Sequence, residues 1–121
     1  MDKLQFSIIF GVIRPEINER LSVGLITVVN NEIKVKYSRK KINALKHLFS
    51  PKAYEQLNKV IYNIKRNRTV NSIGAIDYMT RYSNNLLSVS QLQTVDIEPT
   101  KKSEDWLYRT YVYEEYSLKV T

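Results

Sequence analysis

The stretch that decides the fold runs from Leu21 to Tyr37 and reads LSVGLITVVNNEIKVKY. Its first part is rich in Val, Ile and Leu, which is typical of a buried strand. The two asparagines that follow tolerate the positive φ of a tight turn, and the residues from Glu32 to Tyr37 alternate polar and apolar. The stretch therefore predicts a β-hairpin whose second strand turns Ile33, Val35 and Tyr37 toward the core.

The elements around this hairpin follow from the same kinds of pattern. An apolar run before it predicts another strand, from Leu4 to Val12, and a polar connection containing Pro15 joins the two strands. Downstream, one-sided apolar stripes at three- and four-residue spacing predict helices, and short β-branched runs predict strands. The predicted helices span 39–49 after an N-cap at Ser38, 51 to 65–68 after Ser50, 69–84, and 106–116 after Ser103; the predicted strands span 86–89 and 92–97.

This order of elements predicts the fold class. Three strands precede the helices, and a parallel sheet would need a helical crossover between its strands. We therefore expect an α+β fold, with a mainly antiparallel sheet packed by two to four helices. The 121 residues suffice for about one hydrophobic core, so residues 1–121 are interpreted as a single domain.

Composition excludes several kinds of chemistry. The chain has no cysteine, a single histidine at position 47 and only three glycines. Thiol catalysis, thiolate metal sites and Gly-rich phosphate loops are therefore excluded, and we expect neither a metal nor a cofactor nor catalytic residues. The chain shows no secretory signal and no apolar run approaching the ~20 residues of a membrane span, so a cytoplasmic protein that avoids the membrane is expected.

Basic charge is concentrated in the middle of the chain. Residues 34–68 contain eleven Lys or Arg against Glu55 alone, a net charge of +10. Clustered positive charge of this kind binds DNA or RNA, docks an acidic protein partner, or simply keeps a surface solvated, and the sequence leaves these alternatives open. The candidate contact residues are Lys34, Lys36, Arg39, Lys40, Lys41, Lys65, Arg66 and Arg68.

A second candidate set consists of Ser22, Gly24, Trp106 and Tyr111. A glycine inside a strand marks either close packing or the approach of a ligand, and Gly24 is open to both interpretations. Tyr and Trp are favoured at protein interfaces because they combine a large apolar body with a polar tip. The segment from Trp106 to Tyr116 is therefore a candidate to cover the core, to offer a docking ridge, or both.

Several short motifs resemble a bacterial family of domains of unknown function, family number 3037. The resembling segments are short and are spread along nearly the whole chain: Gln5 to Ile9, Ile13 to Pro15, Glu19 to Ile26, Tyr37 to Phe49, Asn85 to Val89 and Trp106 to Tyr108. The chain departs from the family pattern at Ser22, where the family usually has Asn. The resemblance to this family implies a neighbouring gene for a small kinase-like toxin, and therefore a protein partner.

These observations together predict a non-enzymatic binding or accessory domain that acts through a protein partner, such as the product of a neighbouring kinase-like gene. The alternative is a nucleic-acid-binding accessory protein that uses the basic 34–68 surface. A homo-oligomer is compatible with either hypothesis.

Overall fold

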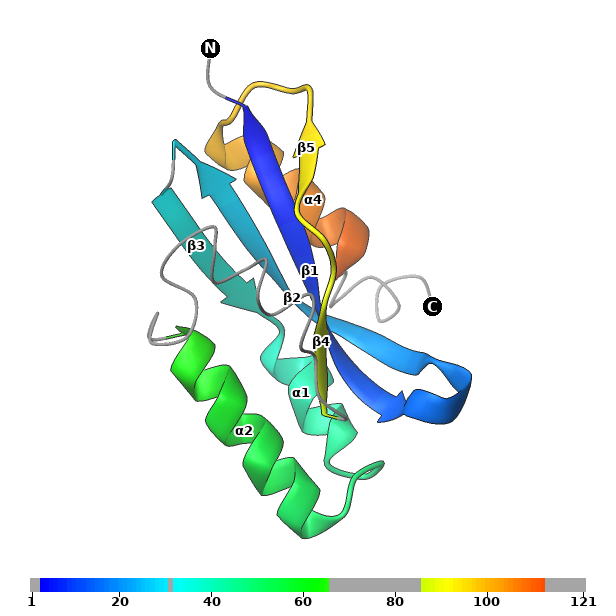
Figure 1. Ribbon diagram of the computed structural model, residues 1–121. Coiled ribbons are helices and arrows are strands. Elements are labelled where there is room, and N and C mark those ends of the chain that lie inside the picture. Colours follow the sequence, from blue (N-terminus) through cyan, green and yellow to red (C-terminus); the bar gives the residue numbers. More distant parts are fainter. Residues whose placement is uncertain (1–2, 31, 66–85, 113–121) are drawn as a thin grey trace, which may run out of the picture.

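The computed structural model describes residues 3–30, 32–65 and 86–112 of the chain. These residues form an antiparallel sheet of five strands, a single turn of 3-10 helix and three α-helices (Figure 1). In chain order the elements are β1 (Leu4–Arg14), the 3-10 turn η1 (Pro15–Ile17), β2 (Glu19–Val29), β3 (Glu32–Tyr37), α1 (Arg39–Leu45), α2 (Pro51–Lys65), β4 (Leu87–Val89), β5 (Gln93–Val95) and α4 (Lys101–Tyr111).

The sheet confirms the predicted α+β class. Its strand order is β3-β2-β1-β4, and β5 pairs with β1 on the same side as β4. Every pairing is antiparallel, and the β2–β3 hairpin turns at Asn30, whose φ is +53°. The strand expected over 21–29 therefore lies inside the sheet, between β1 and β3. The far ends of β1 and β2 extend beyond the helices as a two-stranded arm (Figure 1).

A β-bulge in β2 changes which face of the sheet its side chains point to. Ile9 of β1 pairs with Gly24, but the next residue of β1, Phe10, pairs with Ser22. Val23 is the extra residue, and such an insertion switches which side chains face which layer. As a result Val23 packs on the same face as Ile26 and Val28.

The edge strand beyond β1 is broken into β4 and β5, and Ser90 joins the ladder at the break. Its backbone N–H donates to the carbonyl of Ile8 at 2.9 Å, as a strand residue would. In the other direction the N–H of Ile8 donates to the hydroxyl oxygen of Ser90 at 2.8 Å. A side chain thus replaces a backbone acceptor, which keeps the buried amide of β1 bonded where regular pairing stops.

The sheet separates two hydrophobic clusters. On one face α1 and α2 pack against β1, β2 and β4 through Ile9, Val23, Ile26, Val28, Ile42, Leu45, Leu57, Ile61, Leu87 and Val89. On the other face α4 packs through Leu4, Phe6, Ile8, Leu25, Leu107, Tyr108 and Val112. Ile33, Val35 and Tyr37 pack against the α1–α2 cluster, as the alternation in β3 predicts.

The helix boundaries correct three sequence expectations. The helix expected over 39–49 ends at Leu45. Beyond it the backbone forms tighter hydrogen bonds between residues three apart, such as the bond from the N–H of Leu48 to the carbonyl of Leu45. The last helix begins at Lys101 rather than at position 106. Its N-cap is Thr100, whose hydroxyl accepts from the N–H of Ser103 at 3.1 Å, so Ser103 is not the cap.

Other boundaries agree with the sequence or lie beyond the described residues. Ser38 caps α1 and accepts from the N–H of Lys41 at 3.2 Å, as expected. The strand expected over 92–97 is confined to β5. The helix expected over 69–84 lies outside the described residues. None of the helices in the described part of the chain is long and apolar enough to cross a membrane.

Candidate functional site

The basic residues of the middle segment divide between the two faces of the sheet. Lys34 and Lys36 project from β3 toward α4, where their ammonium groups lie 3.6 Å from the carboxylate of Glu104 and 3.9 Å from that of Asp105. Lys36 also lies 4.5 Å from the centre of the Tyr108 ring. These two lysines therefore hold the edge strand against α4, and the structure does not bring them together with Arg39 and Lys40.

The other cations of this segment that the structure describes lie in α1, in α2 or between them, and these residues form a basic layer. Residues 38–65 contain seven Lys or Arg and one acidic residue, which gives this layer a charge of +6. Their described side chains are exposed, apart from the half-buried Lys41: Arg39, Lys40, Lys46, Lys52 and Lys59. Apart from Glu55, which is also exposed, the charged residues of this layer are cationic, and such a surface attracts a polyanion.

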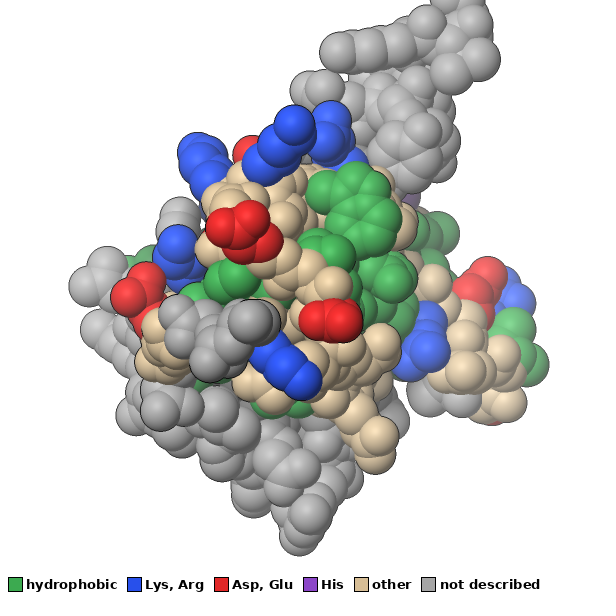
Figure 2. Space-filling model, turned by 90° about the horizontal axis from the view of Figure 1, so that it is seen from above, with side chains coloured by type: hydrophobic (Ala, Val, Ile, Leu, Met, Phe, Trp, Pro, Cys, Tyr) green, Lys and Arg blue, Asp and Glu red, His purple; other side chains and the backbone are tan. Residues whose placement is uncertain are grey.

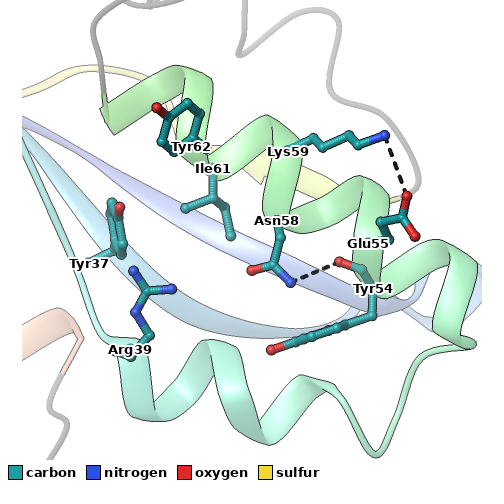
Figure 3. Close-up of a pocket in the computed structure, with 8 residues that line it drawn as sticks. All are labelled: Tyr37, Arg39, Tyr54, Glu55, Asn58, Lys59, Ile61 and Tyr62. Carbon is teal, nitrogen blue, oxygen red and sulfur yellow. Dashed lines mark hydrogen bonds and ion pairs between the residues drawn. The ribbon is translucent and has the colours of Figure 1, made fainter.

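A pocket of about 830 Å³ opens between β3 and α2 within this basic layer (Figure 3). Three tyrosines and two cations are among the residues that line it: Tyr37, Arg39, Tyr54, Glu55, Asn58, Lys59, Ile61 and Tyr62. The guanidinium of Arg39 lies 5.8 Å from the centre of the Tyr37 ring. Stacking of bases requires aromatic faces, and contact with phosphates requires positive charge beside them.

The two walls of this pocket come from different elements. Tyr37 ends β3, and Arg39 begins α1, so the cap at Ser38 between them fixes how both side chains leave the backbone. The N–H of Ser38 donates to the carbonyl of Val23 at 2.7 Å, which ties this junction to β2. The opposite wall is one face of α2, whose residues approach the cavity at helical spacing (Figure 3).

Two bonds order the α2 wall. The side-chain amide of Asn58 donates to the carbonyl of Tyr54 at 3.1 Å, one turn earlier in the helix. The hydroxyl of Tyr54 in turn donates to the side-chain oxygen of Asn43 in α1 at 3.4 Å.

Lys59 and Glu55 form an exposed ion pair at 3.4 Å on the rim of the pocket. Exposed pairs of this kind contribute about 0–1 kcal/mol, so Lys59 can exchange its partner for another anion at little cost.

The other predicted contact residues lie elsewhere. Lys41 turns toward β2, and its ammonium group donates to the hydroxyl of Ser22 at 3.3 Å. Lys65 is the last residue of α2, while Arg66 and Arg68 lie outside the described residues. Arg39 is thus the predicted cation that lines the pocket, and Lys40 follows it in α1.

The predicted docking residues have mixed roles. The hydroxyl of Ser22 donates to the carbonyl of Tyr111 at 2.6 Å, so this residue ties the end of α4 to β2. Gly24 lies under Tyr37 in the β2–β3 ladder. Trp106 is 49% exposed and Tyr111 is 38% exposed, with the Tyr111 ring stacked on Phe6 at a centroid distance of 5.0 Å. Figure 2 shows hydrophobic side chains gathered between charged ones on the face seen from above.

Sequence reasoning missed the pocket residues that belong to the apolar stripe of α2. Tyr54 and Ile61 belong to the apolar side of α2 and pack in the α1–α2 cluster, but both also line the cavity, and Asn58 between them was not singled out. The signal that could have found the site is this polar amide, because it stands one turn after Tyr54 and one turn before Ile61 on the inward side of the helix.

Within the parts of the chain that the structure describes, no three metal-ligating side chains come together. Comparisons with protein-family models, curated proteins and solved structures give no match to the chain. The resemblance to the bacterial family of unknown function therefore draws no support from them and stays a prediction.

Proposed function

We propose that this domain binds single-stranded nucleic acid through the basic layer of α1 and α2. The observation that supports the proposal most directly is the pocket in which Arg39 and Lys59 lie beside three tyrosine rings. Phosphate contacts supply affinity for any strand, and aromatic side chains supply stacking platforms that a base in a duplex cannot reach.

The distribution of charge supports the same proposal. Acidic partners in α4 neutralise Lys34 and Lys36, whereas residues 38–65 hold Glu55 as their single acid. A purely solvated surface has no need of such segregation, since interspersed charges keep a protein soluble equally well. A phosphate backbone matches a layer of one sign, and its contact residues would be Arg39, Lys40, Lys52 and Lys59.

Salt dependence tests this proposal. A fluorescein-labelled RNA strand of about twelve nucleotides, long enough for one small domain, is titrated with the protein and followed by anisotropy. Four phosphate contacts on a single strand predict that log affinity falls with log salt at a slope of about −3. A duplex of the same length should bind more weakly, because its bases are stacked away from the tyrosines. Absence of binding at about 50 mM salt would reject the proposal.

A second candidate function rests on the exposure of Trp106 and Tyr111. Large aromatic side chains that stay half exposed on one helix are typical anchors for a protein partner. The partner proposed from the sequence is the product of a neighbouring kinase-like gene. Co-purification of the two proteins, lost on Trp106→Ala and kept on the exposed Lys102→Ala, would support this candidate; no co-purification with the wild-type chain would reject it.

A further inference from the structure

The pocket between β3 and α2 holds one hydrogen-bonding group in a fixed orientation. The Asn58 amide nitrogen donates one of its two N–H groups to the carbonyl of Tyr54, and this bond fixes the orientation of the side chain. In Figure 3 the carbonyl oxygen of Asn58 points to the side where Tyr37 and Arg39 lie. The pocket therefore offers a positioned acceptor between aromatic and cationic groups.

The lining of the pocket suits a planar heterocycle, and its volume exceeds that of one base and leaves room for the adjoining sugar and phosphate. Its volume of about 830 Å³ lies within the roughly 300–1,000 Å³ of small-ligand sites. Ile61 and the tyrosine rings supply apolar contact, Arg39 lines the pocket, and Lys59 lies on its rim beside Glu55. A single base that leaves the stack of a bound strand would meet all three kinds of contact.

The acceptor discriminates between bases by simple chemistry. Cytosine carries an amino group at C4, which can donate to the oxygen of Asn58. Uracil is the same size but carries a carbonyl oxygen at C4, so in the same position it sets one acceptor against another; its N3–H can reach Asn58 only if the base shifts in the pocket. An uncompensated polar group in a pocket weakens binding, so the two pyrimidines should be told apart.

We propose that this pocket takes one unstacked base that bears an exocyclic amino group and that Asn58 selects it. The inference rests on the proposed binding of single-stranded nucleic acid and deepens it, because it names the kind of base at one position. Cytosine and uracil are the decisive pair, since they differ at C4 and keep the same ring and the same backbone.

The experiment compares oligo(C) and oligo(U) RNA of equal length with three proteins: the wild-type chain, Asn58→Ala, and the matched control Gln56→Ala, which removes an exposed amide elsewhere on α2. The wild type and Gln56→Ala should bind oligo(C) about three- to tenfold more tightly, the range that one hydrogen bond supplies. Asn58→Ala should bind both strands equally. Circular dichroism confirms that all three proteins are folded.

Two outcomes separate this inference from the function it rests on. Equal affinity of the wild type for oligo(C) and oligo(U), or a preference that survives in Asn58→Ala, overturns the role of Asn58 while the binding of single strands stands. Failure of the wild type to bind either strand overturns both.

Discussion

Gly24 faces Tyr37 across the β2–β3 ladder, and a Cβ atom added to Gly24 would lie 2.9 Å from the Cβ of Tyr37 and 3.0 Å from the carbonyl oxygen of Lys36. Neither atom is the end of a flexible side chain, so any larger residue must push β3 outward. The glycine thus allows the close approach that places Tyr37 on the wall of the pocket. Of the two roles that the sequence leaves open for Gly24, close packing accounts for these contacts.

Gly24→Ala should therefore lower the free energy of unfolding by about 1–3 kcal/mol, as overpacking of a well-filled site does. Urea denaturation followed by circular dichroism measures this loss. The control is Thr94→Ala on the exposed side of β5, which should stay within about 0.5 kcal/mol of the wild type. A Gly24→Ala protein as stable as the wild type would show that the sheet can widen here without cost.

Leu25→Ala should be among the most damaging single substitutions in the sheet. The side chain of Leu25 is 2% exposed and packs from the interior strand β2 against the α4 cluster. Truncation of a buried leucine leaves a cavity and costs about 2–5 kcal/mol. Thermal and urea unfolding give the value directly, and a loss below about 1 kcal/mol would contradict the packing described for α4.

Thr100→Ala should destabilise the protein more than Ser103→Ala. Thr100 is the N-cap of α4, and loss of an N-cap hydroxyl costs about 0.5–2 kcal/mol. Ser103 is the donor to that cap through its backbone N–H, which alanine keeps, so its substitution should cost within about 0.5 kcal/mol. If Ser103→Ala lowered the stability more than Thr100→Ala, Ser103 rather than Thr100 would be the N-cap of α4.

Lys34→Gln and Lys36→Gln should each change stability by less than about 1 kcal/mol, because both lysine side chains are largely exposed to solvent. The small loss should shrink further as salt is added, since salt screens exposed charges. Unfolding measured at low and high ionic strength checks both points. A loss of several kcal/mol from either substitution would mean that the lysine carries more of the β3–α4 contact than its geometry indicates.

Local patterns in the sequence predict the hairpin and the sheet face of β3, because strand alternation is read residue by residue. Alternation also implies that Lys34 and Lys36 point away from Tyr37. Their partners Glu104 and Asp105 could not be predicted, since the sequence does not say which face of the sheet α4 covers. The sequence predicts two short strands over 86–89 and 92–97, but not that both pair with β1 or that the hydroxyl of Ser90 replaces a backbone acceptor between them.

The candidate site, too, could be predicted from the sequence only in part. Charge counting found Arg39 and the basic layer, and capping rules found Ser38, which fixes the junction before α1. The pocket itself depends on how far α2 lies from β3, a tertiary distance that a helical stripe does not encode. The stripe therefore did not indicate that Tyr54 lines a cavity and bonds to Asn43.

The most direct test of the central claim compares two double variants that remove the same charge from opposite faces of the sheet. Arg39→Gln with Lys59→Gln removes two cations from the pocket, and Lys34→Gln with Lys36→Gln removes two from the α4 face. Binding of oligo(C) RNA is measured by anisotropy at several salt concentrations. The first variant should lose about tenfold in affinity and reduce the magnitude of the salt slope by about 1.4; the second should stay within about twofold of the wild type. Equal losses in both variants would show that binding follows net charge alone and would contradict a nucleic-acid site on the α1–α2 face.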